Sequence, residues 1–209
     1  MQKYTNRYIF ALMSKAAQTR KFIIERTAPI FNTKGYEGTS LADLTASTGL
    51  TKGSLYGNFS DKEDIAREAF RFTIERIREV AKTFVGNTGS PRLRLMKLLD
   101  FYESVYANPP VPGGCPLLNT AIEADDYRIS MKKVVASEIN KSIEFMNVLL
   151  KQGVEEHEFH ADINTRELAT VFFAAIEGGL MISKVSSSSV ALSAAISHCK
   201  SVIKSITIK

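Results

Sequence analysis

Apolar residues recur at intervals of three and four along nearly the whole chain of 209 residues, and the strict alternation typical of strands is rare. The pattern is most regular near the C-terminus, where the apolar residues are Leu192, Ala195, Ile196, Cys199, Val202, Ile203 and Ile206. Hydrophobic residues make up 44% of the chain, which is enough to bury a substantial core. The sequence therefore predicts an all-α fold, as one compact unit or two small ones.

Glycines, prolines and capping residues predict where the helices begin and end. An irregular lead (residues 1–17) precedes a first amphipathic helix that stops at Gly35, and a long connecting helix extends to Gly86. Three prolines and two glycines make residues 108–114 a loop. The expected helices cover residues 19–34, 40–49, 52–59, 61–85, 91–108, 116–125 and 129–155, and two more include residues 168–179 and 192–206.

Residues 40–58 have the spacing of a helix-turn-helix motif. Ser40 is a natural N-cap, with Asp43 in the reciprocal position of a capping box. Gly49 suits a tight turn because a positive φ costs glycine little, and Thr51 can cap the second helix. The first helix is expected to brace the second, whose polar face would enter a DNA major groove.

The second helix offers several groups that can bind DNA. Lys52 can donate to guanine or phosphate, Gly53 allows close approach of the backbone, and Tyr56 and Asn58 can bond phosphate oxygens. Lys62 opens the next helix, where its charge opposes the helix dipole, and this unfavourable position suggests a phosphate partner. The predicted DNA-contacting residues are Thr39, Ser40, Thr51, Lys52, Gly53, Ser54, Tyr56, Asn58 and Lys62.

Charge is concentrated in the same part of the chain. Residues 1–60 contain eight basic and three acidic residues and so hold the whole net charge of +5, while the remainder balances at 19 of each sign. A basic head on a neutral body is typical of a polyanion-binding protein. Taken alone, the charge is equally consistent with an ordinary solvated surface.

The segment Thr-Gly-Leu-Thr-Lys-Gly-Ser-Leu-Tyr-Gly-Asn-Phe-Ser-Asp-Lys-Glu-Asp-Ile, residues 48–65, resembles the signature of the TetR family of transcriptional repressors. The likeness extends over residues 19–70, through Phe31, Gly35 and Tyr36. The family often has His at the position of Asn58 and Ala at that of Thr45. Residues 113–119 also look like a segment of some members, and the rest agrees in helix number only.

The resemblance implies a three-helix DNA-binding head (18–62) and a larger helical ligand-binding and dimerisation domain (63–209). It further implies a homodimer on a near-palindromic double-stranded operator, released when a small-molecule effector moves the helix at 61–85. The sequences of the last two helices are consistent with a homodimer, because their small residues allow close approach of a helix from a second chain. Packing within one chain is the alternative. The expected interface residues are Leu168, Phe172, Ala175, Gly179, Leu192, Ala195, Ile196, Cys199, Val202 and Ile203.

Helical phase also suggests a ligand pocket of apolar residues with a few polar groups. The candidates are Phe101, Tyr102, Val105, Tyr106, Cys115, Leu118, Asn119, Glu123, Phe172, Phe173 and Glu177, although residues of each of these kinds are more often part of a plain core. Cys115 precedes a helix, a position that lowers a thiol pKa and would suit an oxidant or electrophile sensor. A small buried residue is the favoured interpretation.

Other functions find little support. Two distant cysteines disfavour a disulfide scaffold and fit a reducing cytoplasm, and we expect no signal peptide, no membrane segment and no cofactor. His157 and His160 stand in a polar turn (153–162) with spacing too loose for a metal site. Without paired carboxylates, a nucleophile elbow or a phosphate loop, an enzyme is not expected. Two alternatives stay open: a helical adaptor whose basic head binds an acidic protein, and a constitutive regulator without effector.

Overall fold

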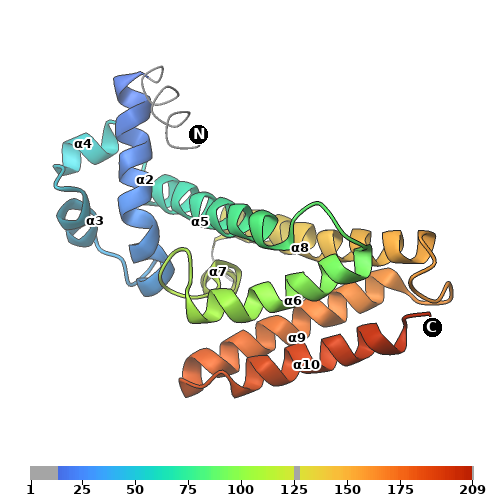
Figure 1. Cartoon of the computed structure of the whole chain (residues 1–209). Helices are drawn as coiled ribbons and strands as arrows, with labels where there is room; N and C mark the ends of the chain where they lie inside the picture. The colour runs from blue at the N-terminus through green and yellow to red at the C-terminus, as the bar shows by residue number, and fades with distance from the viewer. Residues whose placement is uncertain (1–13, 125–127, 209) are drawn as a thin grey trace. The chain divides into compact units, whose positions relative to one another are not determined.

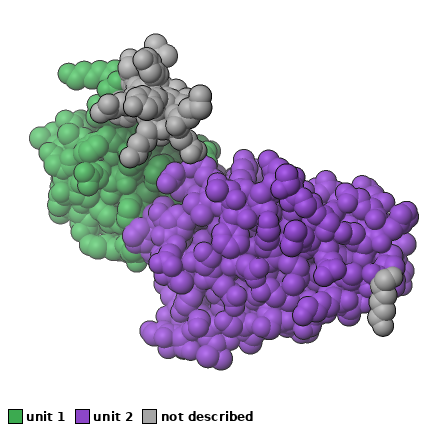
Figure 2. Space-filling view, viewed as in Figure 1, with its two compact units in different colours: residues 1–75 green, residues 76–209 purple. Residues whose placement is uncertain are grey.

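The structure is a computed structural model that describes residues 14–124 and 128–208. Over these residues the regular structure is helical, apart from one isolated antiparallel bridge between Phe159 and Thr207. The predicted all-α fold is therefore confirmed. The chain divides into two compact units, residues 1–75 and residues 76–209 (Figure 2).

Unit 1 contains α2 (Lys15–Lys34), α3 (Leu41–Thr48), α4 (Lys52–Tyr56) and the first part of α5 (Lys62–Val85) (Figure 1). These helices pack around one apolar cluster: Ile23, Leu44, Leu55, Phe59 and Ile65, with Ile24, Phe31, Leu41 and Leu50 against its edge. The division between the units falls inside α5, beyond the boundary at residue 62 that the sequence suggested. Helix α5 therefore belongs to both units.

Two helix ends in unit 1 differ from the sequence expectation. Helix α2 begins at Lys15, because the Ser14 side chain caps it by accepting from the Ala17 amide, so the last residues of the expected irregular lead are helical. The rest of that lead, residues 1–13, lies outside the described residues. Helix α4 ends at Tyr56 rather than Phe59, since the Asn58 amide closes a tighter turn onto the Leu55 carbonyl.

Unit 2 contains the end of α5 and five further helices: α6 (Pro91–Ala107), α7 (Pro116–Ala124), α8 (Ile129–Glu155), α9 (Thr165–Ser186) and α10 (Val190–Ser205). Helix α9 packs against both α8 and α10, and α6 packs against α8 and α10. Figure 1 shows α9 and α10 side by side as an antiparallel pair. Side-chain caps begin two of these helices, Ser90 on α6 and Asn164 on α9.

Helix α9 is long and apolar enough to cross a membrane by composition alone, contrary to the expectation that no segment would be. Its buried residues explain the composition differently. Phe172, Ile176 and Leu180 are almost fully enclosed by the chain, and their helix packs along two neighbours. Helix α9 therefore contributes one face to the core of unit 2, and 33% of its most apolar window is buried inside the chain.

Most residues expected at a subunit interface are instead buried within the single chain. Those buried are Phe172, Gly179, Leu192, Ile196, Cys199 and Ile203, while Leu168, Ala175, Ala195 and Val202 are half-buried. The most apolar face of each helix packs against its neighbours in the same chain, so helical phase identified the core. A second apolar stripe of α9 faces outward: Val171, Ala174, Met181, Ile182 and Val185, with half-buried Gly178 among them.

Candidate nucleic-acid interface and buried cavity

The turn between α3 and α4 is defined by local hydrogen bonds. The Ser40 hydroxyl oxygen accepts from the Asp43 amide at 3.1 Å and the Asp43 carboxylate accepts from the Ser40 amide at 2.9 Å, which completes the expected capping box. A hydrogen bond from Lys34, followed by those from Ser40, lowers the pKa of Asp43 to about 2. Gly49 ends α3 in the left-handed region with φ 67°, and Thr51 caps α4 by accepting from the Ser54 amide at 3.2 Å.

Helix α4 turns one side inward and the other outward. Leu55 is fully buried in the cluster of unit 1, whereas Thr51, Lys52, Gly53 and Ser54 are exposed. Tyr56 is half-buried on the same short helix. The N-terminal residues of α4 are thus exposed to a partner, with the Lys52 ammonium and the Ser54 hydroxyl as donors, while the Thr51 hydroxyl donates to the Ser54 hydroxyl oxygen at 3.4 Å.

Three residues expected at DNA have partners inside unit 1. Thr39 is buried, and its hydroxyl donates to the Gly35 carbonyl at 2.5 Å, so it supports the turn before α3. The side-chain amide of Asn58 donates to the Ser54 carbonyl at 2.9 Å. Lys62 donates to the Tyr36 carbonyl at 2.6 Å and lies over that ring at 4.1 Å, which accounts for its position without a phosphate.

Arg20 supports the segment that joins α4 to α5, a role that sequence analysis did not predict. Its guanidinium donates to the Asn58 carbonyl, lies 4.0 Å from the centre of the Phe59 ring and approaches the Asp64 carboxylate at 3.6 Å. One side chain of α2 therefore fixes the segment that joins α4 to α5. The partners lie more than 35 residues away along the chain, beyond the reach of helical periodicity.

A cavity of about 340 Å³ lies within unit 2. Its lining is mostly apolar and aromatic, as small-molecule sites tend to be. The lining residues are Ile77, Phe101, Tyr102, Val105, Tyr106, Pro109, Pro110, Val111, Gly114, Cys115, Pro116, Leu118, Leu180, Lys184 and Ser187. They come from the end of α5, from α6, from the proline-rich loop, and from the segments around α7 and α9.

Six of the expected pocket residues line this cavity: Phe101, Tyr102, Val105, Tyr106, Cys115 and Leu118. Glu123, Phe172 and Phe173 do not, and the two phenylalanines are core residues. Asn119 stands behind the lining and accepts from the Lys184 ammonium at 2.9 Å. Lys184 also donates to the Gly113 carbonyl at 2.8 Å, and sequence analysis did not predict this lysine in the cavity wall.

Glu177 lies next to the cavity wall. The Cys115 thiol donates to its Oε1 atom at 3.2 Å, and the buried Oε2 atom has no hydrogen-bond partner within residues 14–124 and 128–208. Burial raises the pKa of Glu177 to about 7. In the described part of the chain, no lysine or arginine lies within ion-pair distance of this carboxyl.

The proposed sensor chemistry of Cys115 does not fit this environment. Burial, and then the nearby Glu177, raise the pKa of the thiol well above its usual value. The amides of Leu117 and Leu118 at the start of α7 act in the opposite direction and are outweighed. The alternative of a lowered thiol pKa is therefore wrong, and Cys115 is a half-buried cavity residue. Burial likewise raises the pKa of Tyr102.

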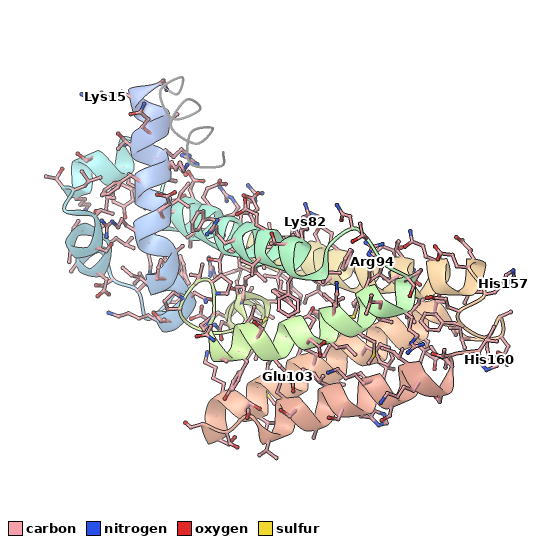
Figure 3. The ribbon with its side chains drawn as sticks, in the orientation of Figure 1. Lys15, Lys82, Arg94, Glu103, His157 and His160 are labelled. Carbon is pink, nitrogen blue, oxygen red and sulfur yellow. The ribbon has the colours of Figure 1, made fainter. Side chains whose placement is uncertain are left out.

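His157 and His160 belong to the turn between α8 and α9. His157 and His160 project outward at one end of unit 2 (Figure 3), and both are exposed. Within the residues 14–124 and 128–208, no group of three or more His, Cys, Asp or Glu side chains is arranged to hold a metal ion. These residues have the character of a solvated turn.

Two family models match the chain. Residues 23–69 match the model for bacterial regulatory proteins of the tetR family, and residues 91–199 match a tetracycline-repressor-like C-terminal domain. A solved transcriptional regulator of the TetR family from Cytophaga hutchinsonii is 36% identical, with 94% of this chain and 98% of that chain covered and a TM-score of 0.88. The chain belongs to the TetR family.

Two further comparisons agree. The uncharacterised HTH-type transcriptional regulator YxaF of Bacillus subtilis is 26% identical over 82% of this chain and 87% of its own length. The TetR-family regulator CifR, solved with a 26-bp operator duplex, shares the fold with a TM-score of 0.70 at 23% identity, covering 89% of this chain and 93% of its own.

Family membership confirms the main functional prediction from the sequence: the chain is a DNA-binding transcriptional regulator. Members of the family are transcription factors and not enzymes. The N-terminal match spans α3 and α4 with their capped turn, and the C-terminal match covers α6 to α9 and most of α10. The helix-turn-helix thus lies in the first matched segment, and the cavity lining lies in the second except for Ile77 of α5.

Proposed function

We propose that this TetR-family regulator is a cytoplasmic, homodimeric repressor that binds a near-palindromic operator and leaves it when a small molecule occupies the cavity of unit 2. The observation that carries the proposal is the exposed polar end of α4 on a capped helix-turn-helix, within the matched tetR segment. The division into a DNA-binding domain, 18–62, and a ligand-binding and dimerisation domain, 63–209, belongs to the same proposal.

The proposed DNA contacts begin at the N-terminus of α4. Lys52 meets guanine or phosphate, Thr51 and Ser54 offer hydroxyls, and the absent side chain of Gly53 lets the backbone approach the groove. Tyr56 reaches phosphate from the end of the helix. Ser40 is exposed at the start of α3 and is also proposed to contact the backbone, whereas buried Thr39 is no longer included.

The proposed dimer interface is the outward stripe of α9 together with the exposed side of α10. Val171, Ile182 and Val185 are between 52% and 84% exposed in the single chain, and Val190 at the start of α10 is 73% exposed. Large exposed apolar residues grouped on one face are typical of an interface. A two-fold pair of chains would present two α4 helices to successive major grooves about 34 Å apart.

The proposed effector site is the cavity beside α6, because it is apolar, partly enclosed and of a volume suited to a small molecule. Ile77 of α5 belongs to its lining. Since α5 begins directly after the helix-turn-helix, a ligand that displaces Ile77 acts on the helix that carries the DNA-binding head.

Gel-shift and footprinting assays with DNA from upstream of the gene and its neighbours test the proposal. A protected inverted repeat is expected, and Lys52→Ala and Tyr56→Phe should weaken binding while helical content and dimer mass stay unchanged. Lys82→Ala, on the exposed side of α5 in unit 2 (Figure 3), is the matched control that should bind as the wild type does. No protection of any duplex, with capture of an acidic protein instead, would favour the adaptor alternative.

Ligand dependence is tested separately. Thermal shifts across a metabolite panel, followed by release of bound DNA, are expected for an effector. A protein that binds its operator but responds to no compound would be the constitutive regulator.

A further inference from the structure

The Glu177 carboxyl is the least satisfied polar group near the cavity. Among the described residues its buried Oε2 atom has no hydrogen-bond partner, and its Oε1 atom accepts from the Cys115 thiol, which is a weak donor. Buried carboxyl groups are normally hydrogen-bonded or paired with a cation, so this one departs from the rule. Because Cys115 itself lines the cavity, a ligand beside that thiol is within reach of the carboxyl.

The surroundings of this carboxyl favour a positive charge. Among the described residues no counter-cation accompanies it, and Lys184 is already held by the Gly113 carbonyl and the Asn119 side chain. The faces of Phe101, Tyr102 and other aromatic rings in the wall attract cations. A carboxylate and a cation that meet in an apolar enclosure attract each other more strongly than in water.

We propose that the effector of this regulator is an apolar or aromatic amine whose ammonium group displaces the Cys115 thiol and pairs with the Glu177 carboxylate. The inference rests on the proposed function and names the chemistry of its ligand. The cavity volume of about 340 Å³ is at the small end of the range for small-molecule sites. A single aromatic ring with a short aminoalkyl chain is small enough to fit it.

Proton release gives a signature of the pairing. The Glu177 pKa of about 7 lies above its value in water, so the carboxyl is mostly neutral at pH 6 and mostly ionised at pH 8. An ammonium that binds the ionised form therefore releases about one proton at pH 6 and almost none at pH 8. Cys115 and Tyr102 face the same carboxyl, and burial keeps both protonated over this range.

The experiment compares three probes with one carbon skeleton: 3-phenylpropylamine, 3-phenylpropanol and 3-phenylpropanoate. Calorimetry in two buffers of different ionisation enthalpy measures affinity and proton release for the full-length dimer. We expect the amine to bind wild type at least tenfold more tightly than the alcohol. Glu177→Gln keeps the side-chain shape and should abolish the preference and the proton release, while alcohol binding persists and reports an intact cavity.

Glu103→Gln is the matched control. It removes one carboxyl from α6, next to Tyr102 in the sequence but outside the cavity lining, and should behave as the wild type does (Figure 3). Equal amine and alcohol affinities in wild type, or a preference that survives Glu177→Gln, would overturn the amine proposal and leave the effector cavity standing. If 3-phenylpropanoate bound more tightly than the amine, that result would also overturn the amine proposal and leave the effector cavity standing. No binding by any of the three would overturn the amine proposal and the use of this cavity together, while operator binding by the free protein would stand.

Discussion

Val185→Ser is the sharpest test of the proposed dimer interface. Val185 is 84% exposed on the outward stripe of α9, so it contributes little to the folded single chain. Full burial of a valine side chain stabilises the state that buries it by roughly 2 kcal/mol, and a two-fold interface would bury two copies of Val185. Scaled by the exposed fraction, the two copies contribute about 3 kcal/mol, so the substitution should weaken dimerisation roughly a hundredfold.

Sedimentation velocity over a concentration series measures the dissociation constant of the dimer, and circular dichroism melts verify that the helices stay folded. Val148→Ser makes the same chemical change on α8, where the side chain is 40% exposed and outside the proposed interface. This control is expected to leave the dimer intact. Operator binding by the Val185 variant should recover at protein concentrations that restore the dimer.

If Val185→Ser dimerised as tightly as wild type while Val148→Ser released monomers, the interface would lie on α8 and not on the outward stripe of α9. A monomeric wild-type protein that still protects an inverted repeat would remove the two-fold arrangement altogether.

Four further substitutions test other elements of the structure. Gly153→Ala places a methyl group 2.3 Å from two ring atoms of fully buried Phe159. Urea titration should therefore show that the free energy of unfolding falls by about 1–3 kcal/mol. An unchanged urea midpoint would mean that the Phe159 ring shifts freely. Ser40→Ala removes the side-chain cap of α3 and should lower the free energy of unfolding by about 1 kcal/mol in the same urea titration. The pKa of Asp43 in the folded protein, about 2, lies below its ordinary value of 3.8. Its contribution to the free energy of unfolding is therefore present above about pH 4 and is lost as the pH falls towards 2. The melting temperature of Asp43→Asn should fall less than that of wild type between pH 4 and pH 2. Lys52→Ala should reduce the slope of log affinity against log salt by roughly 2, since each dimer would lose two phosphate contacts, and an unchanged slope would exclude Lys52 from the DNA backbone.

The helix-turn-helix was predictable because its determinants are local. Ser40 and Asp43 are three residues apart, Gly49 takes the positive φ that ends α3, and Thr51 caps α4. Each of these features is encoded within one turn of chain. Contiguous signals of this kind can be recognised without knowledge of the tertiary structure.

The outward faces and the polar wall of the cavity were not predictable from periodicity. Helical phase separates an apolar face from a polar one, but α9 has apolar residues on two faces and only the packing of α8 and α10 decides which is inside. Lys184 reaches the cavity because the loop carbonyl of Gly113 accepts from it across 71 residues. Arg20 likewise meets its partners through space, so neither residue carried a signal in its own segment.

Release by a ligand needs an element that both units share, and α5 meets this requirement. Its first residues follow the recognition segment, with the Asp61 carboxylate accepting from the Asp64 amide at 2.7 Å. Towards its other end, Ile77 lines the cavity and the Phe84 ring meets Phe101 edge-on at 6.0 Å. Phe101 in turn contacts Tyr102, whose pKa Glu177 helps to raise. If the proposed amine binds at Glu177, it would disturb a set of packed rings that ends on α5, and a coupling free energy of about 1–3 kcal/mol would be enough for regulation.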